Sequence, residues 1–386
     1  MKILYITTLY TRTNSSAAIR NNSLVKGLIE LGHEVYVKTI DWGRDESEFL
    51  NKENNGSISK YNLKIINKIN HYKDSILKNN CSLHILVPFI KSIIFFPDNT
   101  KEWIKSFRYD NIHNNYDIVI SSSDTKSSHF IACKIKQEHP SIKWIQIWGD
   151  PWTYDINTPW YMRPITSFYE SRLFRLADKI VYVSELTYLL MKKKQPMYSQ
   201  KMFYVPRSFY YQCDKVATID SNNIKILYTG TLSYGRNITA LINAINMYNE
   251  IGTCKIELHI YGNSTDVDQN DSPYVFHHEA VDYSKIKHIY SGADIFLFIS
   301  NKGDTSQIPG KLYDYLGCSQ PILCLCDSEQ TKLINYLKTV PKCIVINNNE
   351  QSIFDLLNSL DQAMLDKYRG VCSEYSPMSI AKQILE

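Results

Sequence analysis

Buried strands alternate with helices in this chain from its first residues onward. Residues 2–9 are predicted as a buried strand, residues 10–16 as a polar loop and residues 17–31 as a helix. Gly32 stands where a glycine often ends a helix, and residues 35–40 are predicted as the next strand. This order is typical of a βαβ unit, in which a helix connects two parallel strands. The pattern therefore predicts an α/β fold built on a parallel sheet.

The same alternation begins again in the second half, with a strand at 224–230 and a helix at 237–251. The 386 residues exceed the roughly 250–300 at which single hydrophobic cores stop growing. We therefore expect two Rossmann-like parallel-sheet domains. The first is expected at 1–206 and the second at 207–370, and residues 371–386 are expected to form a helix that packs back on the first domain.

The two halves carry opposite net charge, which the total of +4 conceals. Residues 1–205 contain 28 lysines and arginines and 19 acidic residues, a net charge of +9. Residues 206–386 contain 15 and 20, a net charge of −5. The asymmetry indicates that the first half faces something anionic, either an anionic membrane surface or a phosphorylated substrate. Nucleic acid is not expected, because the basic half has no helix-turn-helix pattern and no motif of interleaved basic and aromatic residues.

The cysteines and the hydropathy indicate a cytoplasmic protein. There are nine cysteines and no C-x-x-C pair, which argues against a disulfide framework or a structural zinc site. The first residues are too few for a signal peptide and are predicted as a strand. No run of about 18 apolar residues occurs, so no transmembrane helix is expected.

Two segments of the basic half leave open whether they contact a membrane. Residues 85–97 are markedly apolar and are predicted either as a core helix or as a patch on a membrane surface. Residues 192–194 are three lysines at the end of a predicted helix, where they are either solvated or attracted to anionic lipid. A peripheral location on the inner face of the cytoplasmic membrane is therefore expected.

Several well-known catalytic motifs do not occur. The sequence has no G-x-G-x-x-G, no G-x-x-x-x-G-K-[ST], no H-E-x-x-H or other metal-ligand spacing, and no G-x-S-x-G. No metal and no bound cofactor are expected. The remaining possibility is a cleft at a sheet edge in which loops bind the ligand.

One such loop, 228–237, follows a predicted strand and leads into a helix. Gly230 permits a tight turn there, and Arg236 lies beside the start of the helix, where backbone amides attract anions. This is either a phosphate-binding arrangement or an ordinary connection between a strand and a helix.

A second loop, 300–317, has the same position after a strand. Lys311 falls in the first turn of the following helix and can pair with a phosphate, and Asp314 lies on the same helix face and can accept hydrogen bonds from ribose hydroxyls. The alternative is a solvated ion pair between these two side chains.

The sequence of this loop, S-x6-Q-I-P-G-K-L-Y-D-Y-L-G-C-S-Q-P-I-L, resembles the second-domain signature of retaining GT-B glycosyltransferases of family 4. The first half also resembles that family, through Arg20, the sequence G-H-E-V at 32–35 and A-D-K-I-V at 177–181. The sequence G-D-P-W at 149–152 resembles a loop of members that build cell-surface polysaccharides. The resemblance covers nearly the whole chain and implies two domains that face a central cleft.

The resemblance implies transfer of a sugar from a nucleotide diphosphate donor, UDP- or GDP-linked, to a saccharide acceptor. Arg236 and Lys311 would offset the charge of the leaving diphosphate, and Asp150 would face the acceptor or the donor sugar. The acceptor would be lipid-linked, as in O-antigen or capsule assembly, and the enzyme a metal-independent, retaining hexosyltransferase. The residues that the resemblance places at the donor are Ser15, Ser16, Gly230, Tyr261, Gly262, Asn263, Val281, Asp304, Ser306, Gln307, Ile308, Pro309 and Asp314.

The chain departs from the family pattern at its acidic pair. The family has two glutamates eight positions apart, whereas here Asp314 is preceded at that spacing by Ser306, with Asp304 the nearest acid. Which of these two takes the place of the first glutamate stays open. Two other functions also stay open: a nucleotide-sugar epimerase of the same fold, and a catalytically inactive subunit that binds donor or lipid.

Overall fold

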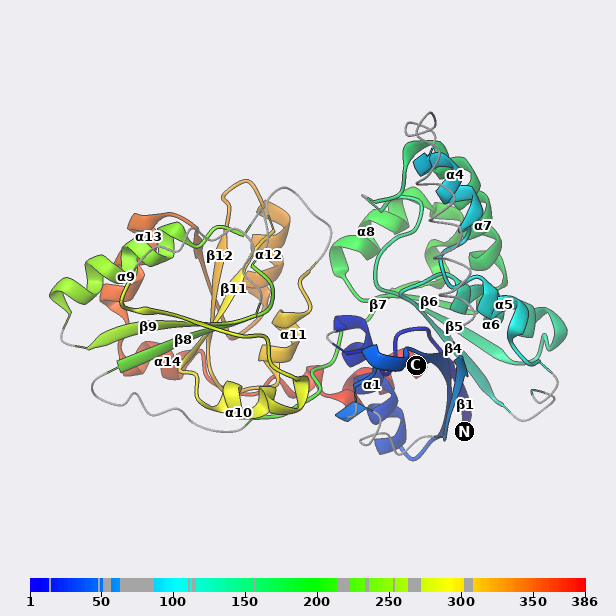
Figure 1. Cartoon of the computed structure of the whole chain (residues 1–386), viewed down its shortest axis with the longest axis horizontal. Helices are drawn as coiled ribbons and strands as arrows, with labels where there is room; N and C mark the ends of the chain where they lie inside the picture. The colour runs from blue at the N-terminus through cyan, green and yellow to red at the C-terminus, as the bar shows by residue number, and fades with distance from the viewer. Residues whose placement is uncertain are drawn as a thin grey trace. The chain divides into compact units, whose positions relative to one another are not determined.

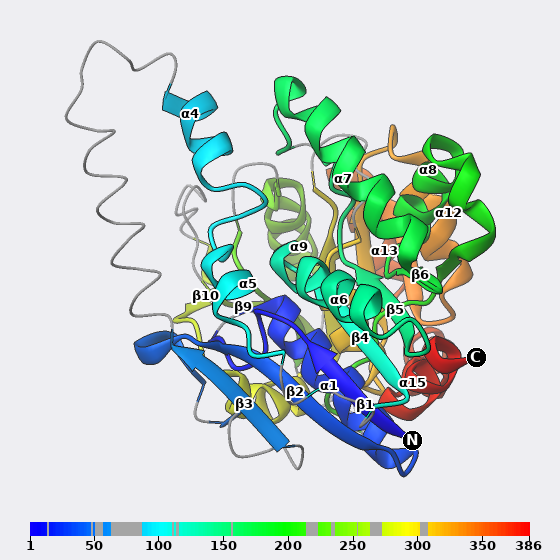
Figure 2. The same cartoon turned by 90° about the vertical axis from the view of Figure 1, so that its right-hand side faces the viewer.

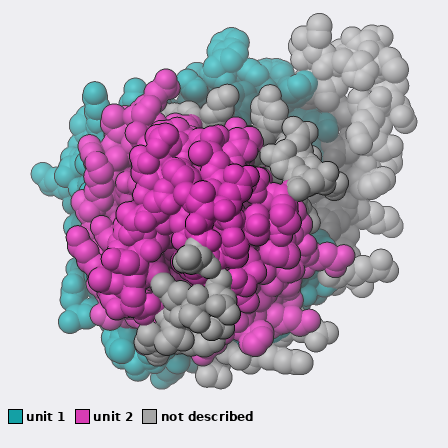
Figure 3. Space-filling view, turned by 90° about the vertical axis from the view of Figure 1, so that its left-hand side faces the viewer, with its two compact units in different colours: residues 1–207, 377–386 teal, residues 208–376 magenta. Residues whose placement is uncertain are grey.

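The chain folds into two compact units in the computed structural model (Figures 1 and 3). Unit 1 comprises Met1–Arg207 and Pro377–Glu386, and unit 2 comprises Ser208–Ser376. The structure describes residues 1–13, 15–47, 49–50, 57–62, 87–109, 112, 116–155, 157–213, 223–232, 236–252, 254–262, 272–301 and 308–386.

Unit 1 is built on a seven-stranded, all-parallel sheet in the order β3-β2-β1-β4-β5-β6-β7. Its strands are β1 (Lys2–Ile6), β2 (Glu34–Asp41), β3 (Ser57–Asn62), β4 (Ile118–Ser123), β5 (Lys143–Trp148), β6 (Lys179–Tyr182) and β7 (Met202–Tyr204). Its helices are α1 (Ser16–Glu30), η1 (Gly43–Asp45), α4 (Val87–Ile94), α5 (Glu102–Ser106), α6 (Ser127–Glu138), η3 (Trp160–Met162), α7 (Arg163–Leu176), α8 (Glu185–Lys194), η4 (Pro196–Lys201) and α15 (Pro377–Leu385).

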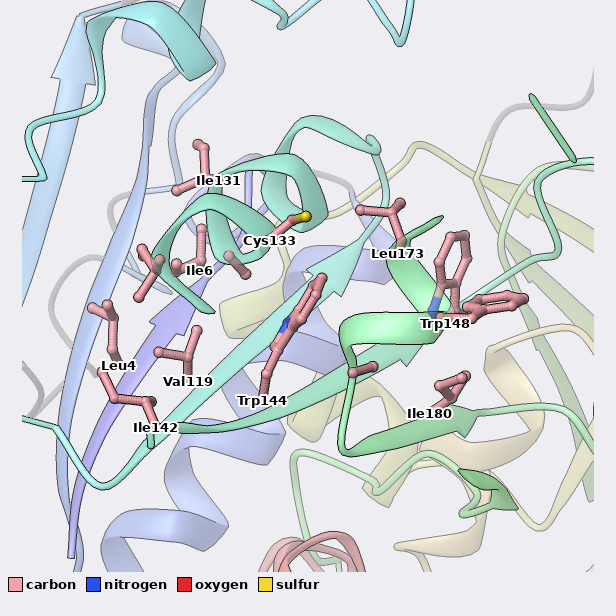
Figure 4. Packing of buried hydrophobic residues seen from close by; sticks show 14 of the residues in the cluster. Leu4, Ile6, Val119, Ile131, Cys133, Ile142, Trp144, Trp148, Leu173 and Ile180 are labelled. Carbon is pink, nitrogen blue, oxygen red and sulfur yellow. The ribbon is translucent and has the colours of Figure 1, made fainter. Parts of the chain in front are cut away.

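Hydrophobic cores cover both faces of this sheet, as parallel sheets require. One core packs the sheet against α6 and α7 and includes the buried side chains of Trp144 and Trp148 (Figure 4). The other packs the sheet against α1 and α15 through residues such as Leu28 and Ile384 (Figure 2). The last helix of the chain is thus part of unit 1.

A glycine lets α15 lie directly against α1. A Cβ atom on Gly27 would lie 1.9 Å from the carbonyl oxygen of Pro377, so any side chain there would displace α15. The ammonium group of Lys179 on β6 donates hydrogen bonds of 3.0 Å to the carbonyl oxygens of Gln383 and Ile384. These carbonyls end α15 and would otherwise lack partners inside the helix.

Unit 2 is built on a six-stranded, all-parallel sheet in the order β10-β9-β8-β11-β12-β13. Its strands are β8 (Asn223–Thr229), β9 (Lys255–Tyr261), β10 (Val275–His278), β11 (Ile295–Ile299), β12 (Ile322–Cys326) and β13 (Cys343–Asn347). Its helices are α9 (Thr239–Ile251), η5 (Tyr283–Lys285), α10 (Ile286–Ser291), α11 (Lys311–Leu316), α12 (Thr331–Thr339), α13 (Glu350–Ser359), α14 (Gln362–Lys367) and η6 (Ser373–Tyr375).

In both sheets the strand order reverses beside the first strand. This doubly wound order confirms the predicted fold class of two Rossmann-like domains. The reversal lies between β1 and β4 in unit 1 and between β8 and β11 in unit 2. Ligands of such sheets bind outside the carboxyl ends of the strands at this point, which is where the functional residues are to be sought.

Three local expectations differ from the structure. Residues 44–80, which are rich in Asn, Lys and Glu, are predicted as an exposed insertion, but residues 57–62 within them form an edge strand, β3. The sequence also predicts a helix at 99–113, whereas among the described residues of that range only Glu102–Ser106 are α-helical, as α5. The helix expected from residue 237 begins at Thr239. Asn237 lies before the N-cap residue Ile238, and its side chain accepts a hydrogen bond of 2.7 Å from the Thr239 amide.

Candidate functional site

The candidate site of unit 2 lies where β8, β9 and β11 end. Gly230 follows β8 directly and has φ +137°, a conformation that favours glycine. Its amide donates a hydrogen bond of 2.9 Å to the carbonyl oxygen of Tyr261. A Cβ atom on Gly262 would lie 2.2 Å from the carbonyl oxygen of Gly230. The loops after β8 and β9 are therefore packed backbone against backbone, which only glycine allows.

Arg236 is held beside this glycine turn by its guanidinium group. Its Nη1 donates hydrogen bonds of 2.9 Å to the Tyr228 hydroxyl and to the Thr231 carbonyl oxygen. Its Nε donates one of 3.0 Å to Oδ1 of Asn301, the second residue after β11. The guanidinium group thus connects the two strand ends on either side of the reversal and has a fixed position before any ligand binds.

Lys311 and Asp314 complete the same cluster. Lys311 Nζ lies 3.6 Å from Asp314 Oδ2, and its Cε lies 3.9 Å from where a Cβ on Gly230 would be. The Asp314 side chain is only 7% exposed, and its Oδ1 accepts a hydrogen bond of 3.3 Å from the Tyr283 hydroxyl. The pair is therefore not the solvated surface pair that the spacing also allowed. Gly230, Arg236 and Lys311 together present a glycine turn flanked by two cations, a combination suited to a phosphate group.

Two residues that sequence reasoning missed hold α11 in place. The Tyr315 hydroxyl accepts a hydrogen bond of 3.1 Å from the amide of Thr229, the last residue of β8. The ammonium group of Lys342, which is 2% exposed, donates hydrogen bonds to the carbonyl oxygens of Tyr315 and Cys318. Burial lowers the pKa of Lys342 to about 8. The motif around Lys311 contains Tyr315, but nothing in the spacing indicated the contact with β8.

The other predicted donor residues of unit 2 vary in placement. Tyr261 ends β9 and stacks on His278, with ring centroids 4.2 Å apart. Val281 is half-buried between β10 and η5, and Ile308 and Pro309 immediately precede α11. Asn263, Asp304, Ser306 and Gln307 lie outside the described residues.

Ser15 and Ser16 begin α1 in unit 1. Ser15 Oγ caps the helix by accepting a hydrogen bond of 3.2 Å from the Ala18 amide. Ser16 Oγ accepts one of 2.9 Å from Nη1 of Arg207, whose Nη2 donates to the Ser16 carbonyl oxygen at 2.6 Å. Both hydroxyls thus already have protein partners.

Asp150 follows β5 and lies near the cation of Lys126. Burial raises the pKa of the Asp150 carboxyl, while the nearby charge of Lys126 opposes that shift. Burial likewise lowers the pKa of Lys126, while the nearby carboxylates of Asp150 and Asp124 oppose that shift. Both shifts favour the neutral form of the group, and desolvation by burial is the larger cause in each case.

A buried ion pair between Arg20 and Asp124 lies near Asp150 and Lys126 and was not predicted from the sequence. Arg20 Nη2 donates a hydrogen bond of 2.5 Å to Asp124 Oδ1 and one of 3.1 Å to Ser122 Oγ. A Cβ on Gly149 would lie 2.7 Å from Arg20 Nη1, so this glycine makes room for the guanidinium group. The signal that could have found Asp124 is the polar run S-S-S-D-T-K at 121–126, which begins with the last three residues of β4.

Glu170 on α7 holds the loop that carries Asp150. Its Oε1 accepts hydrogen bonds of 3.0 and 3.4 Å from the amides of Trp152 and Thr153. The residue is fully buried, and burial raises the pKa of its carboxyl. Glu170 therefore positions Asp150 through the backbone, and no sequence motif indicated it.

Within the described residues, no three His, Cys, Asp or Glu side chains are arranged to bind a metal ion. None of the helices described here is long and apolar enough to span a bilayer.

Solved structures with the same two-domain fold are glycosyltransferases and epimerases. The sequence matches no family model, and no curated protein matches it. In the structural comparison, a putative UDP-N-acetylglucosamine 2-epimerase from Listeria monocytogenes has a TM-score of 0.58 and 13% identity, over 100% of this chain and 94% of that chain. A lipopolysaccharide outer core galactosyltransferase has a TM-score of 0.53 and 13% identity, over 100% of this chain and 98% of that chain. An alpha-glucosyltransferase in complex with UDP and a 13-mer DNA has a TM-score of 0.54 and 12% identity, over 98% of this chain and 95% of that chain.

Identities this low show the fold and nothing finer. The chain has the GT-B fold, which glycosyltransferases and UDP-N-acetylglucosamine 2-epimerases share. Their shared fold does not distinguish transfer from epimerisation, so the choice depends on the residues of the site.

Proposed function

We propose that the protein is a glycosyltransferase that moves a sugar from a nucleotide diphosphate donor to a saccharide acceptor. The observation that carries the proposal is the position of Arg236 and Lys311 close to Gly230, where β8 ends. In this position the two cations would neutralise the diphosphate as it leaves. The buried carboxylate of Asp314 would accept hydrogen bonds from the ribose. Tyr261 and Val281 would line the pocket for the nucleotide base.

The proposed reaction retains the anomeric configuration and needs no nucleophile from the protein. The acceptor hydroxyl would attack the anomeric carbon on the face from which the diphosphate leaves. The bond from that carbon to the diphosphate breaks, the new glycosidic bond forms, and a phosphate oxygen takes the hydroxyl proton. Fixed cations are the electrostatic support that this reaction requires. Asp150, whose pKa is raised by burial, would hydrogen-bond the acceptor or the donor sugar.

The proposed acceptor is a lipid-linked saccharide at the cytoplasmic face of a membrane, in the assembly of a surface polysaccharide. The net charge of +9 over residues 1–205 supports an anionic acceptor or surface. One of the similar structures contains DNA, but that acceptor is a property of that protein. The expectation that this chain binds no nucleic acid stays a prediction.

Transfer is tested by turnover of the two cation variants. Lys311→Ala and Arg236→Ala should each lower release of the nucleoside diphosphate by about 10²–10³-fold, the usual cost of removing one preorganised electrostatic group. Lys338→Ala, which removes an exposed lysine of α12 in the same unit, is the matched control and should turn over like the wild type. If neither cation variant loses turnover, the site assignment is wrong.

Epimerisation is the second candidate, because two of the similar structures are UDP-N-acetylglucosamine 2-epimerases. An epimerase would convert the nucleotide sugar with no acceptor present, whereas a transferase would form a glycoside only with one. Product analysis with and without acceptor separates the two. An inactive subunit that only binds donor or lipid would give neither product.

A further inference from the structure

We propose that the outward face of α7 binds phosphate headgroups of an anionic lipid bilayer, in a pocket built around Arg172 and Arg175. The inference rests on the proposed function in one respect, which is that such binding would bring unit 1 to a lipid-linked acceptor. The surface itself is formed by residues of α7, η3, η4 and α4.

One face of α7 is exposed along its whole length. Ile165, Phe168, Arg172 and Arg175 follow one another at spacings of three and four residues, which places them on one side of the helix. Ile165 is 41% and Phe168 66% exposed. The opposite side packs into unit 1, where Figure 2 shows α7 next to α6. The outward face therefore begins with apolar residues and ends with two arginines.

The arginines line an open pocket of about 430 Å³. Its lining residues are Pro164, Ser167, Phe168, Ser171, Arg172, Arg175 and Tyr198. Neither arginine forms an ion pair with any residue that the structure describes. The single acidic residue of α7, Glu170, is buried and bonded to backbone amides. Two guanidinium groups with serine hydroxyls beside them match the oxygen atoms of a phosphodiester.

Exposed apolar side chains also occur on η3, which directly precedes α7, on η4, which contributes Tyr198 to the pocket, and on α4. Trp160 on η3 is 78% exposed, and Met197 on η4 is 85% exposed. On α4, Phe89 is 43% exposed and its ring lies 5.3 Å from that of Tyr161 on η3. The apolar segment 85–97 thus includes a surface helix, and the expectation of a core helix is not supported for Phe89. Exposed aromatic and aliphatic residues beside arginines are typical of surfaces that lie on a membrane.

The combination of charge and apolar surface favours a bilayer over a free anion. A soluble phosphate would need the arginines but would gain nothing from Trp160, Phe168 and Met197. A bilayer uses both, because its headgroups pair with the cations and its interface takes up the aromatic rings. Several exposed apolar side chains on neighbouring elements also indicate a docking surface rather than a random distribution.

Vesicle binding tests the arginines. Wild-type protein should co-sediment with vesicles that contain phosphatidylglycerol and stay in solution with vesicles of phosphatidylcholine alone. The double variant Arg172→Gln, Arg175→Gln should bind about thirty-fold more weakly, since each basic residue near an anionic surface contributes about fivefold. The control Lys105→Gln, Lys382→Gln removes the same charge from two exposed ion pairs of unit 1 and should bind far better than the arginine variant.

Trp160 reports on the apolar part of the surface. The other tryptophans of the chain are buried or half-buried, so a shift of emission to shorter wavelength on adding the phosphatidylglycerol vesicles should come from Trp160. Trp160→Phe should abolish the shift. Phe168→Ala should weaken binding, whereas Ile251→Ala, at an exposed position of unit 2, should not.

Three results would overturn the proposal. They are equal binding to both kinds of vesicle, an arginine variant that binds like the lysine control, and stabilisation of the wild type by inorganic phosphate without binding to vesicles. Failure of the proposed function is seen separately, because nucleotide-sugar binding by unit 2 is measured without vesicles. The double arginine variant should keep that binding, and Lys311→Ala should keep vesicle binding.

Discussion

At the scale of single residues, buried charges hold a helix end in unit 2 and a loop in unit 1. Lys342 holds the end of α11 in unit 2 through two carbonyl oxygens, and Glu170 holds the Asp150 loop in unit 1 through two amides. A buried charge is costly unless it is bonded, so such groups are found where a fixed position matters. Their altered pKa values make them testable by the pH dependence of stability.

Lys342 should make the folded state more stable as the pH rises above 8. Burial lowers its pKa from 10.5 to about 8, so between these values the folded protein has lost a proton that the unfolded chain keeps. The free energy of unfolding of the wild type, minus that of Lys342→Met, should therefore rise by about 2 kcal/mol from pH 7 to pH 9.5. Chemical denaturation at several pH values measures this difference. A difference that is constant with pH would contradict the assignment.

Asp150 should lower stability at neutral pH. Burial raises the pKa of the Asp150 carboxyl, so keeping it ionised at neutral pH lowers the free energy of unfolding. Below the pKa of the unfolded chain the carboxyl is protonated in both states, and this loss of stability is absent. Asp150→Asn should thus stabilise the protein at pH 7 by on the order of 1 kcal/mol and lose that gain near pH 3.5. Turnover should fall at the same time, as is common when a site residue is replaced. Melting temperatures at the two pH values and one turnover assay are sufficient; a variant less stable than wild type at pH 7 would refute the prediction.

At the scale of elements, the alternation of strands and helices was predictable because each strand is short, apolar and bounded by polar turns. β3 was missed because an edge strand with Ser, Lys and Asn carries little apolar signal. The pairing of Lys311 with Asp314 was predictable because both lie in one local motif, and their role in donor binding stays a prediction. The contacts of Arg20 with Asp124 and of Tyr315 with Thr229 join positions far apart in the chain, and no local spacing encodes them.

The contact between α1 and α15 gives a test of how the last helix stabilises unit 1. Gly27→Ala puts a Cβ atom where the Pro377 carbonyl oxygen now lies, so α15 must shift away from the core it covers. The expected loss is about 2 kcal/mol in the free energy of unfolding, in the range for overpacking. The matched control is Gly292→Ala, where the nearest atom is 3.5 Å from the new Cβ. Equal stability of Gly27→Ala and this control, by chemical denaturation, would show that α15 is not packed in this way.

At the scale of the whole molecule, the net charge of +4 combines a basic first half with an acidic second half. The acidic half would have to bind a diphosphate against its own net charge of −5. Gly230 with the fixed cations of Arg236 and Lys311 supplies local positive charge for that purpose. The basic half presents Arg172 and Arg175 without acidic partners among the described residues. The two units thus divide donor binding and surface binding in the account proposed here.

Donor binding is the central claim, and a thermal-shift screen with UDP-sugars and GDP-sugars tests it most directly. A ligand that binds the folded state stabilises it by mass action, so at least one nucleotide sugar should raise the melting temperature of the wild type. The same compound should have little effect on Lys311→Ala and its full effect on Lys338→Ala. The account is contradicted if no nucleotide sugar stabilises the wild type, or if Lys311→Ala responds as the wild type does.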